Sequence, residues 1–289
     1  MNDIDSVNHV GIVVRDLAAT VDRYEAMGFG LTPFSPHSGA WKPGETIKPL
    51  GSGNRCVMFA SSYLEILANA DPAILSERLA GYLRHHQGAH IICFGSQRLQ
   101  AVDDRLRTSG VSTSGVIPLQ RDVDTPQGVR TAKFERVQFA PDDSPEGYIQ
   151  AAHHLTPDYV YQRRYIEHPN GCTALSDVYL VVDDVVSYAS RYERYTGLKA
   201  QTDSNVAQIR FPLVGALTIM TPKRALERLP ATLYPPLPGI AAVAFLCPDV
   251  SAQRKRLREA GIYATDAGNR VIVPAELASG VAVVFENPQ

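Results

Sequence analysis

The strongest constraint on the fold is a pattern that occurs four times along the chain. Each copy begins with a short apolar run, continues through a polar step into an amphipathic segment, and ends at glycine followed by an apolar residue. The runs begin near His9, His90, Val178 and Val243, and the closing glycines are Gly28, Gly110, Gly197 and Gly261. Because β-branched and aromatic runs favour strands and glycine commonly ends a helix, each copy predicts a strand followed by a helix.

Further strand-like segments follow each predicted helix. They lie at residues 31–35, 55–60 and 63–67; 116–119, 131–139 and 148–151; 206–211 and 216–220; and 270–273 and 281–285. One strand, one helix and three strands make a βαβββ module, so the sequence predicts four such modules and an α+β fold class. The Gly- and Pro-rich residues 36–53 are expected to form a long loop over a binding site.

A boundary is predicted between the second and third copies. Residues 153–171 contain prolines, tyrosines and histidines and show little alternation, which is typical of an ordered connector. A chain of 289 residues has room for two domains. We expect an N-terminal domain over residues 1–155, a connector over 156–172 and a C-terminal domain over 173–289.

Composition excludes several classes of protein. A net charge of -2 gives no electrostatic basis for binding nucleic acid or an anionic membrane. The apolar runs are too short to span a bilayer, and the acidic N-terminus does not resemble a secretory signal. The four cysteines are far apart and form no CxxC pair, which favours a reducing cytoplasm over a disulfide framework. The expected partner is therefore a small-molecule substrate.

Histidine is unevenly distributed. All eight histidines lie at or before His168. Since histidine is the commonest metal ligand and the commonest acid or base near neutral pH, any chemistry is predicted in the first half of the chain.

The repeat and the opening segment, residues 8–17 (NHVGIVVRDL), resemble the vicinal oxygen chelate (VOC) superfamily, in particular its glyoxalase-like domains. The resemblance covers nearly the whole chain, and its two-domain architecture is similar to that of the extradiol dioxygenases. It implies two glyoxalase/bleomycin-resistance/dioxygenase-like domains, each with a cup-shaped mixed sheet around a site.

The resemblance also implies a set of site residues in the N-terminal domain. Metal-binding members take ligands from the first and last strands of each module, which correspond here to His9, Glu65, His90 and Gln150. Glu65 alternates with Leu64 and Ile66 and should face away from them. Two imidazoles and a carboxylate suit a divalent Fe, Mn, Ni, Co or Zn ion. The alternative for each strand histidine is a hydrogen-bonded core residue.

Acid and base roles are assigned in the same cup. Glu65 is expected to be both ligand and catalytic group, and His153, with His154 beside it, is a candidate acid or base at the rim. The alternative for both histidines is a hydrogen bond within the connector.

The second half of the chain lacks the ligand pattern. Asp177 and Ala242 stand where the first half has His9 and His90, and Thr218 and Val283 occupy the last strands. We expect a degenerate, metal-free domain that serves as a scaffold, a lid or a dimerisation surface, so a homodimer is one alternative. Extradiol dioxygenases of similar architecture keep their metal in the C-terminal domain.

Three functions compete. The first is a metal-dependent glyoxalase-like enzyme, of lyase or isomerase type, that binds a small oxygen-chelating substrate in the N-terminal cup. The second is an Fe(II) ring-cleavage dioxygenase that uses the same residues, and the third is a metal-free small-molecule binding or resistance protein. Metal content distinguishes the third from the others, and oxygen uptake distinguishes the second from the first.

Overall fold

The computed structural model describes residues 2–40, 42–70, 76–230 and 232–288, and the expected mixed α+β fold is confirmed. In the first half the helices and strands are β1 (Ser6–Val13), α1 (Leu17–Ala26), β2 (Ser35–Gly39), β3 (Lys48–Met58), β4 (Tyr63–Asn69), α2 (Glu77–His85), β5 (Gly88–Gly95), α3 (Leu99–Thr108), β6 (Ile117–Thr125), β7 (Gly128–Gln138) and β8 (Tyr148–His154).

Two short helices, α4 (Pro157–Val160) and α5 (Arg163–Ile166), lie in the connector. The second half contains β9 (Ala174–Val181), α6 (Val185–Thr196), β10 (Gln201–Thr202), β11 (Val206–Arg210), β12 (Ala216–Met220), α7 (Pro222–Arg228), β13 (Gly239–Leu246), α8 (Val250–Glu259), β14 (Thr265–Asp266), β15 (Arg270–Val273), the 3-10 turn Ala275–Leu277 and β16 (Ala282–Glu286). None of these helices in the described parts of the chain is long and apolar enough to cross a membrane.

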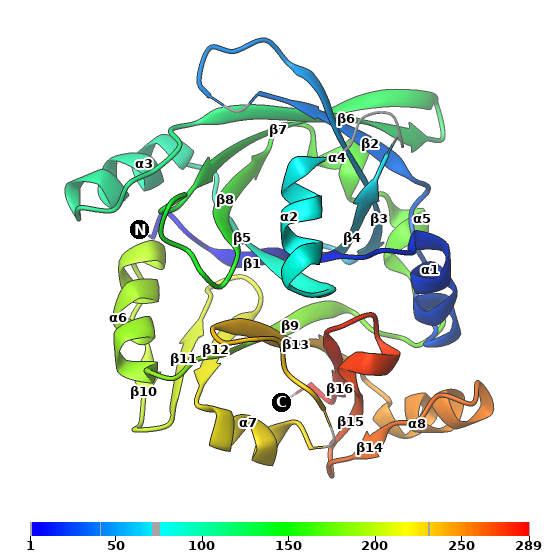
Figure 1. Ribbon diagram of the computed structural model, residues 1–289. Coiled ribbons are helices and arrows are strands. Elements are labelled where there is room, and N and C mark those ends of the chain that lie inside the picture. Colours follow the sequence, from blue (N-terminus) through cyan, green and yellow to red (C-terminus); the bar gives the residue numbers. More distant parts are fainter. Residues whose placement is uncertain (1, 41, 71–75, 231, 289) are drawn as a thin grey trace.

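The first half forms a closed barrel, not the open cup that the sequence suggested. Its strands follow the order β1-β4-β3-β2-β6-β7-β8-β5, and β5 pairs back onto β1 (Figure 1). The pairing of β2 with β6, which aligns His37 with Arg121, completes the ring. All of strand β2 except Ser35 lies within residues 36–53, which the sequence predicted as a loop because Pro36 and Gly39 are typical turn residues.

The second half keeps an open sheet. Its strand order among the described residues is β10-β11-β12-β9-β13-β16-β15-β14. A pairing of Ile240 in β13 with Ala89 in β5 connects this sheet to the barrel. Figure 1 shows the barrel above and the open sheet below, with helices along the outside.

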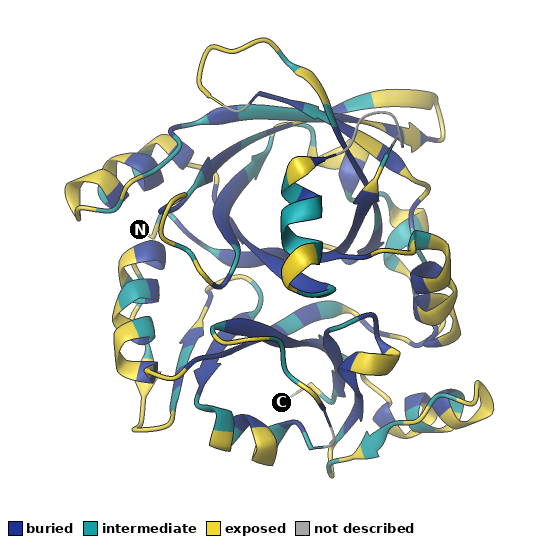
Figure 2. Cartoon of the chain, viewed as in Figure 1, coloured by how far each residue is buried: buried dark blue, intermediate teal, exposed yellow. Residues whose placement is uncertain are grey.

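Local sequence signals set the helix starts. The carboxylates of Asp16, Asp184 and Asp249 accept hydrogen bonds from the backbone N–H groups of Ala19, Ser187 and Ala252, at 2.9, 3.0 and 2.8 Å. Each aspartate satisfies an N–H group that a helix start leaves unpaired. The strands are largely buried while the helices expose their outer faces, so the helices cover the outside of both sheets (Figure 2).

The barrel interior is apolar at both ends. One end lies under α2 and contains Val13, Leu67, Leu79, Ile91 and Tyr148. The other end lies against the connector and contains Cys56, Met58, Tyr63, Val123, Ala132, Phe134 and Val160. Because apolar side chains line both ends, polar side chains in the middle lie in an environment of lower dielectric constant than water.

Candidate active site in the barrel

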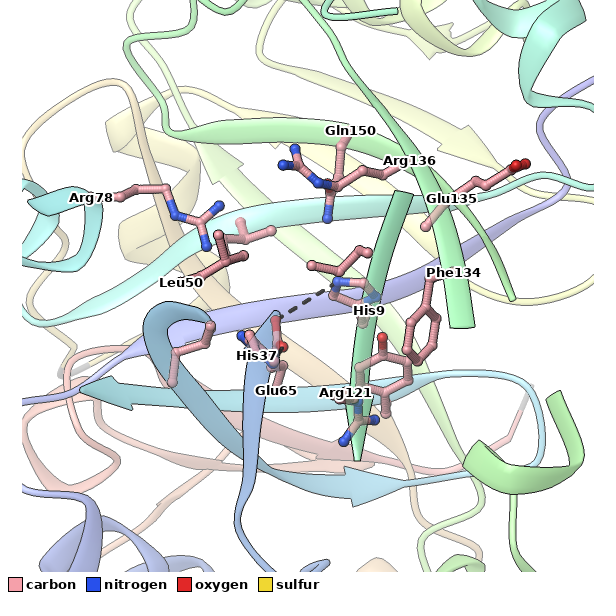
Figure 3. Close-up of a pocket in the computed structure, with 15 residues that line it drawn as sticks. His9, His37, Leu50, Glu65, Arg78, Arg121, Phe134, Glu135, Arg136 and Gln150 are labelled. Carbon is pink, nitrogen blue, oxygen red and sulfur yellow. Dashed lines mark ion pairs between the residues drawn. The ribbon is translucent and has the colours of Figure 1, made fainter. Parts of the chain in front are cut away.

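A cavity occupies the middle of the barrel, and every barrel strand contributes to it. It contains about 640 Å³ of space free of protein atoms, counting the solvent at its mouth. Its lining comprises His9, His37, Leu50, Tyr63, Glu65, Leu67, Arg78, Ile91, Leu119, Arg121, Phe134, Glu135, Arg136, Gln150 and Ala152 (Figure 3). Arg78 comes from α2, which places that helix at the cavity's edge.

The alternation of side chains along β4 places the Glu65 carboxylate in the cavity. Tyr63, Glu65 and Leu67 line the cavity, whereas Leu64 and Ile66 belong to the main hydrophobic core outside the barrel wall. Glu65 thus faces away from its apolar neighbours, as its position in the strand predicts.

The Glu65 carboxylate lies between two imidazoles. Its Oε2 is 3.9 Å from Nε2 of His9, and its Oε1 is 3.5 Å from Nε2 of His37 (Figure 3). Asn54 Nδ2 also donates a hydrogen bond of 2.5 Å to Oε1. This carboxylate is 7% exposed, so it depends on these neighbours to offset the loss of water.

A hydrogen bond from the preceding residue sets the orientation of His9. Its Nδ1 lies 2.8 Å from Oδ1 of Asn8. An amide oxygen can only accept, so this contact assigns the proton of the neutral ring to Nδ1 and leaves the Nε2 lone pair facing Glu65. Asn8 in turn donates to the hydroxyl of Tyr161 at 2.9 Å, and the His9 ring stacks on Tyr63 at 4.4 Å.

Burial shifts the protonation of all three groups toward their neutral forms. It lowers the pKa of His9 well below its usual value and that of His37 to about 3, and Arg121 adds to both shifts. Burial also raises the pKa of Glu65, an effect opposed by the hydrogen bond from Asn54 and by the charges of Arg121 and Arg78. Both imidazoles are therefore neutral near pH 7, and the carboxyl group is a stronger proton acceptor than it would be in water.

Three arginines approach the cavity from three directions (Figure 3). Arg121 Nη1 donates to Asn54 Oδ1 at 3.1 Å, and its guanidinium lies 5.7 Å from the centre of the Phe134 ring. Arg136 donates to the hydroxyl of Tyr148 and, at 3.2 Å, to the carbonyl of Ala40. The Arg78 guanidinium lies over the Tyr148 ring, 5.0 Å from its centre.

The structure does not bring His90 to this cavity. In the parallel pairs, His9 is aligned with Tyr63 and Ile91 with Tyr148, so Ile91 is the counterpart of His9. A shift of one residue along a strand exchanges the two faces, which places Ile91 inside and His90 outside. His90 instead lines a separate cavity with Tyr82 and His86, where its ring stacks on Tyr82 at 4.7 Å.

The same alternation separates His153 from the cavity. On β8, Gln150 and Ala152 line the cavity, whereas His153 projects from the other face of the strand. His154 is the histidine that packs inside, with its ring centre 4.9 Å from that of Phe134. Gln150 is where the sequence predicted it, and its Oε1 has no hydrogen-bond partner among the described residues.

Sequence reasoning missed His37 and Arg121, as well as the cavity arginines Arg78 and Arg136. His37 was assigned to a loop, and Arg121 lies just beyond the predicted strand 116–119, since β6 extends to Thr125. In β2 the buried residues Ser35, His37 and Gly39 alternate with the less buried Pro36 and Ser38. This alternation appears only in the structure, because the stretch contains no large apolar residue and two typical turn residues.

The comparisons with known proteins identify the family. A model of the family described as a glyoxalase-like domain matches residues 7–196, which span the barrel, the connector and the start of the second half. The chain belongs to this family, within the VOC superfamily. A search of curated proteins found no match.

Solved structures share the fold over the full chain. A hypothetical protein from Staphylococcus aureus is 12% identical, with a TM-score of 0.67 and coverage of 99% of this chain and 100% of that one. A mutant 4-hydroxymandelate synthase from Streptomyces coelicolor is 13% identical, with a TM-score of 0.59 and coverage of 99% and 94%. A fusion protein of a xylose isomerase-like TIM barrel with a 4-hydroxyphenylpyruvate dioxygenase is 12% identical, with a TM-score of 0.55 and coverage of 100% and 49%. At these identities the likeness shows the fold alone.

Members of the superfamily typically use a divalent metal ion, so the donors must be tested against one. Within the described residues, no group of three or more His, Cys, Asp or Glu side chains is placed to hold a metal ion. Of the predicted ligands, His9, Glu65 and Gln150 share the cavity and His90 does not. The four predicted ligands therefore do not converge on one point, and Arg78, Arg121 and Arg136 share the cavity with the three that line it.

Proposed function

We propose that the barrel cavity is the active site of a VOC enzyme, of isomerase or lyase type, in which Glu65 exchanges a proton with a carbon atom of a small substrate. The observation that carries this proposal is the placement of Glu65, a buried carboxylate between the Nε2 atoms of His9 and His37. An acid or base works best when its pKa is near the working pH, and burial moves the pKa of Glu65 in that direction.

The residues around Glu65 supply the rest of the chemistry. The Glu65 carboxylate takes the proton from a carbon next to a carbonyl group, and the electron pair of the C–H bond passes to the carbonyl oxygen as an enolate. Guanidinium groups in a low-dielectric cavity stabilise such an oxyanion. The protonated Glu65 then returns the proton to the carbon skeleton, which gives the isomer. In the lyase case the electron pair of the enolate re-forms the carbonyl group and expels a leaving group from the adjacent carbon, and Glu65 gives its proton to that leaving group. The neutral His9, with its Nε2 facing Glu65, orients the carboxyl group and can share its proton.

The metal dependence predicted from the sequence stays a prediction. Elemental analysis of protein purified without chelators tests it directly. Oxygen uptake with catechols tests the dioxygenase alternative, and ligand binding without turnover would instead favour the metal-free binding protein.

The proposed proton transfer can be measured without knowing the natural substrate. Small 2-oxo acids, ketones and aldehydes are incubated with the protein in D2O, and loss of their C–H signals is followed by proton NMR. We expect Glu65→Gln to slow the exchange by about 10²- to 10⁴-fold, because the amide cannot accept the proton. Glu135→Gln is the matched control, since its side chain lines the same cavity but points away from Glu65 (Figure 3). Equal exchange rates in wild type and Glu65→Gln would overturn the proposal.

A further inference from the structure

The polar lining of the barrel cavity is dominated by cations. Its described residues include three arginines, Arg78, Arg121 and Arg136, but only two carboxylates, Glu65 and Glu135. The side chain of Glu135 points away from the others (Figure 3), which leaves Glu65 as the carboxylate facing the arginines. A cavity with this balance attracts anions and disfavours cations.

Arg121 is connected to the proposed base, Glu65, through one side chain. Asn54 bridges the two, since it accepts from Arg121 at 3.1 Å and donates to Glu65 at 2.5 Å. Arg121 is 6% exposed, and within the described residues it forms no ion pair with a carboxylate. A buried guanidinium has five N–H donors, and leaving them without an anion is costly.

We propose that the substrate is a small organic acid whose carboxylate group binds Arg121, next to Glu65. A guanidinium matches a carboxylate through two parallel hydrogen bonds, which fix its orientation as well as its position. Arg136 and Arg78, on other walls of the cavity, contribute positive potential and stabilise further negative charge on the substrate. This assignment rests on the proposed function for its catalytic consequence, but the binding itself does not depend on proton transfer.

The electrostatics of the neighbouring histidines support this assignment. The charge of Arg121 is one of the causes that lower the pKa values of His9 and His37. A carboxylate bound at Arg121 would cancel part of that charge, and both imidazoles would become better proton acceptors. His9 and His37 would thus accept a proton more readily when an acid occupies the cavity.

The test is a binding experiment with matched pairs of charged and neutral ligands. Glyoxylate, pyruvate, malonate and succinate are compared with their amides by thermal shift and isothermal titration calorimetry, with inorganic phosphate as a second anion. We expect at least one acid to bind and raise the melting temperature, and its amide to bind at least about tenfold more weakly.

Variants locate the binding group. Arg121→Gln should weaken acid binding at least about tenfold, while Arg163→Gln, an exposed arginine on α5, should leave it unchanged. If Arg121→Gln does not fold, Arg121→Lys serves instead, since it keeps the charge but loses the paired donors. It should weaken binding by a smaller factor.

Glu65→Gln separates this proposal from the proposed function. That variant should still bind the acid even though it cannot exchange protons. If the wild type binds an acid but exchanges no protons, the proposed function is wrong and this assignment still holds. No acid binding in the panel, equal binding of acids and amides, binding of phosphate alone, or unchanged binding in both Arg121 variants would each overturn the assignment.

Discussion

Thr218 donates a hydrogen bond of 2.6 Å to Asp177 across the parallel strands β12 and β9. In the barrel, the same two positions belong to Glu65 and His9. Thr218 aligns with Tyr179 as Glu65 aligns with Gly11, and Asp177 and His9 each lie two residues before that partner. The open sheet thus keeps a polar pair where the barrel has its proposed acid–base pair. Gln208 also donates to Asp177 at 3.1 Å, while Oδ1 of Asp177 has no partner among the described residues.

Asp177 should make the stability of the protein pH-dependent. Burial raises its pKa from 3.8 to about 7, so between these values the folded state binds more protons than the unfolded state. Its contribution to the free energy of unfolding should therefore fall as the pH rises from about 4 to 7 and then level off. Asp177→Asn removes this loss, so relative to wild type it should gain about 2 kcal/mol or more between pH 5 and pH 8. Urea unfolding at both pH values measures the gain, and the exposed Asp183→Asn is the control. A stability difference between Asp177→Asn and wild type that is the same at pH 5 and pH 8 would contradict the assignment.

Asn54 should lower the pKa of the proposed base, Glu65. Its hydrogen bond to Glu65 opposes the rise in the pKa of that carboxyl group. Removing it in Asn54→Ala should raise the pKa further, so the acid limb of the pH profile of kcat/KM should move to higher pH by about one unit. The exposed Asn269→Ala is the control. An unchanged or acid-shifted limb would show that Glu65 is not the titrating base.

His154 should weaken the fold in acid. Burial lowers its pKa to about 3, so between pH 6.5 and 3 the unfolded state binds more protons and stability is lost as the pH falls. Its Nε2 has no partner among the described residues, and its ring packs edge-on against Phe134. We expect His154→Phe to be about 1 to 2 kcal/mol more stable than wild type at pH 5, with a smaller difference at pH 8. His153→Phe, on the outward face of the same strand, is the control, and equal effects at the two sites would refute the explanation.

Glycine at position 280, where the two halves meet, should be required for full stability. Its φ of 94° is in the left-handed region, and an added Cβ would lie 1.9 Å from the carbonyl oxygen of Gln87. Gly280→Ala must move the backbone and should cost about 3 kcal/mol or more of unfolding free energy. Gly268→Ala has a similar φ of 72° but no atom within 4 Å, so it should cost only about 1 kcal/mol. Chemical denaturation compares them, and equal costs would show that the close approach to Gln87 is not limiting.

The features that the sequence by itself determined are local ones. Alternation along β4 directs Glu65 to one face and Leu64 to the other, whatever the rest of the chain does. Asp16 marks the start of α1 because its carboxylate reaches an N–H group only three residues away. The α+β class follows from such signals, since each acts within a few residues of the chain.

Only the tertiary structure decided which side chains meet Glu65. His37 and Arg121 face each other because β2 pairs with β6, a contact between segments more than eighty residues apart that closes the barrel. His90 lies outside because the pairing of β5 with β8 aligns Ile91, not His90, with the position of His9. Local patterns fix the two faces of a strand, but the register between distant strands is set by how the whole barrel closes, and a shift of one residue exchanges the two faces.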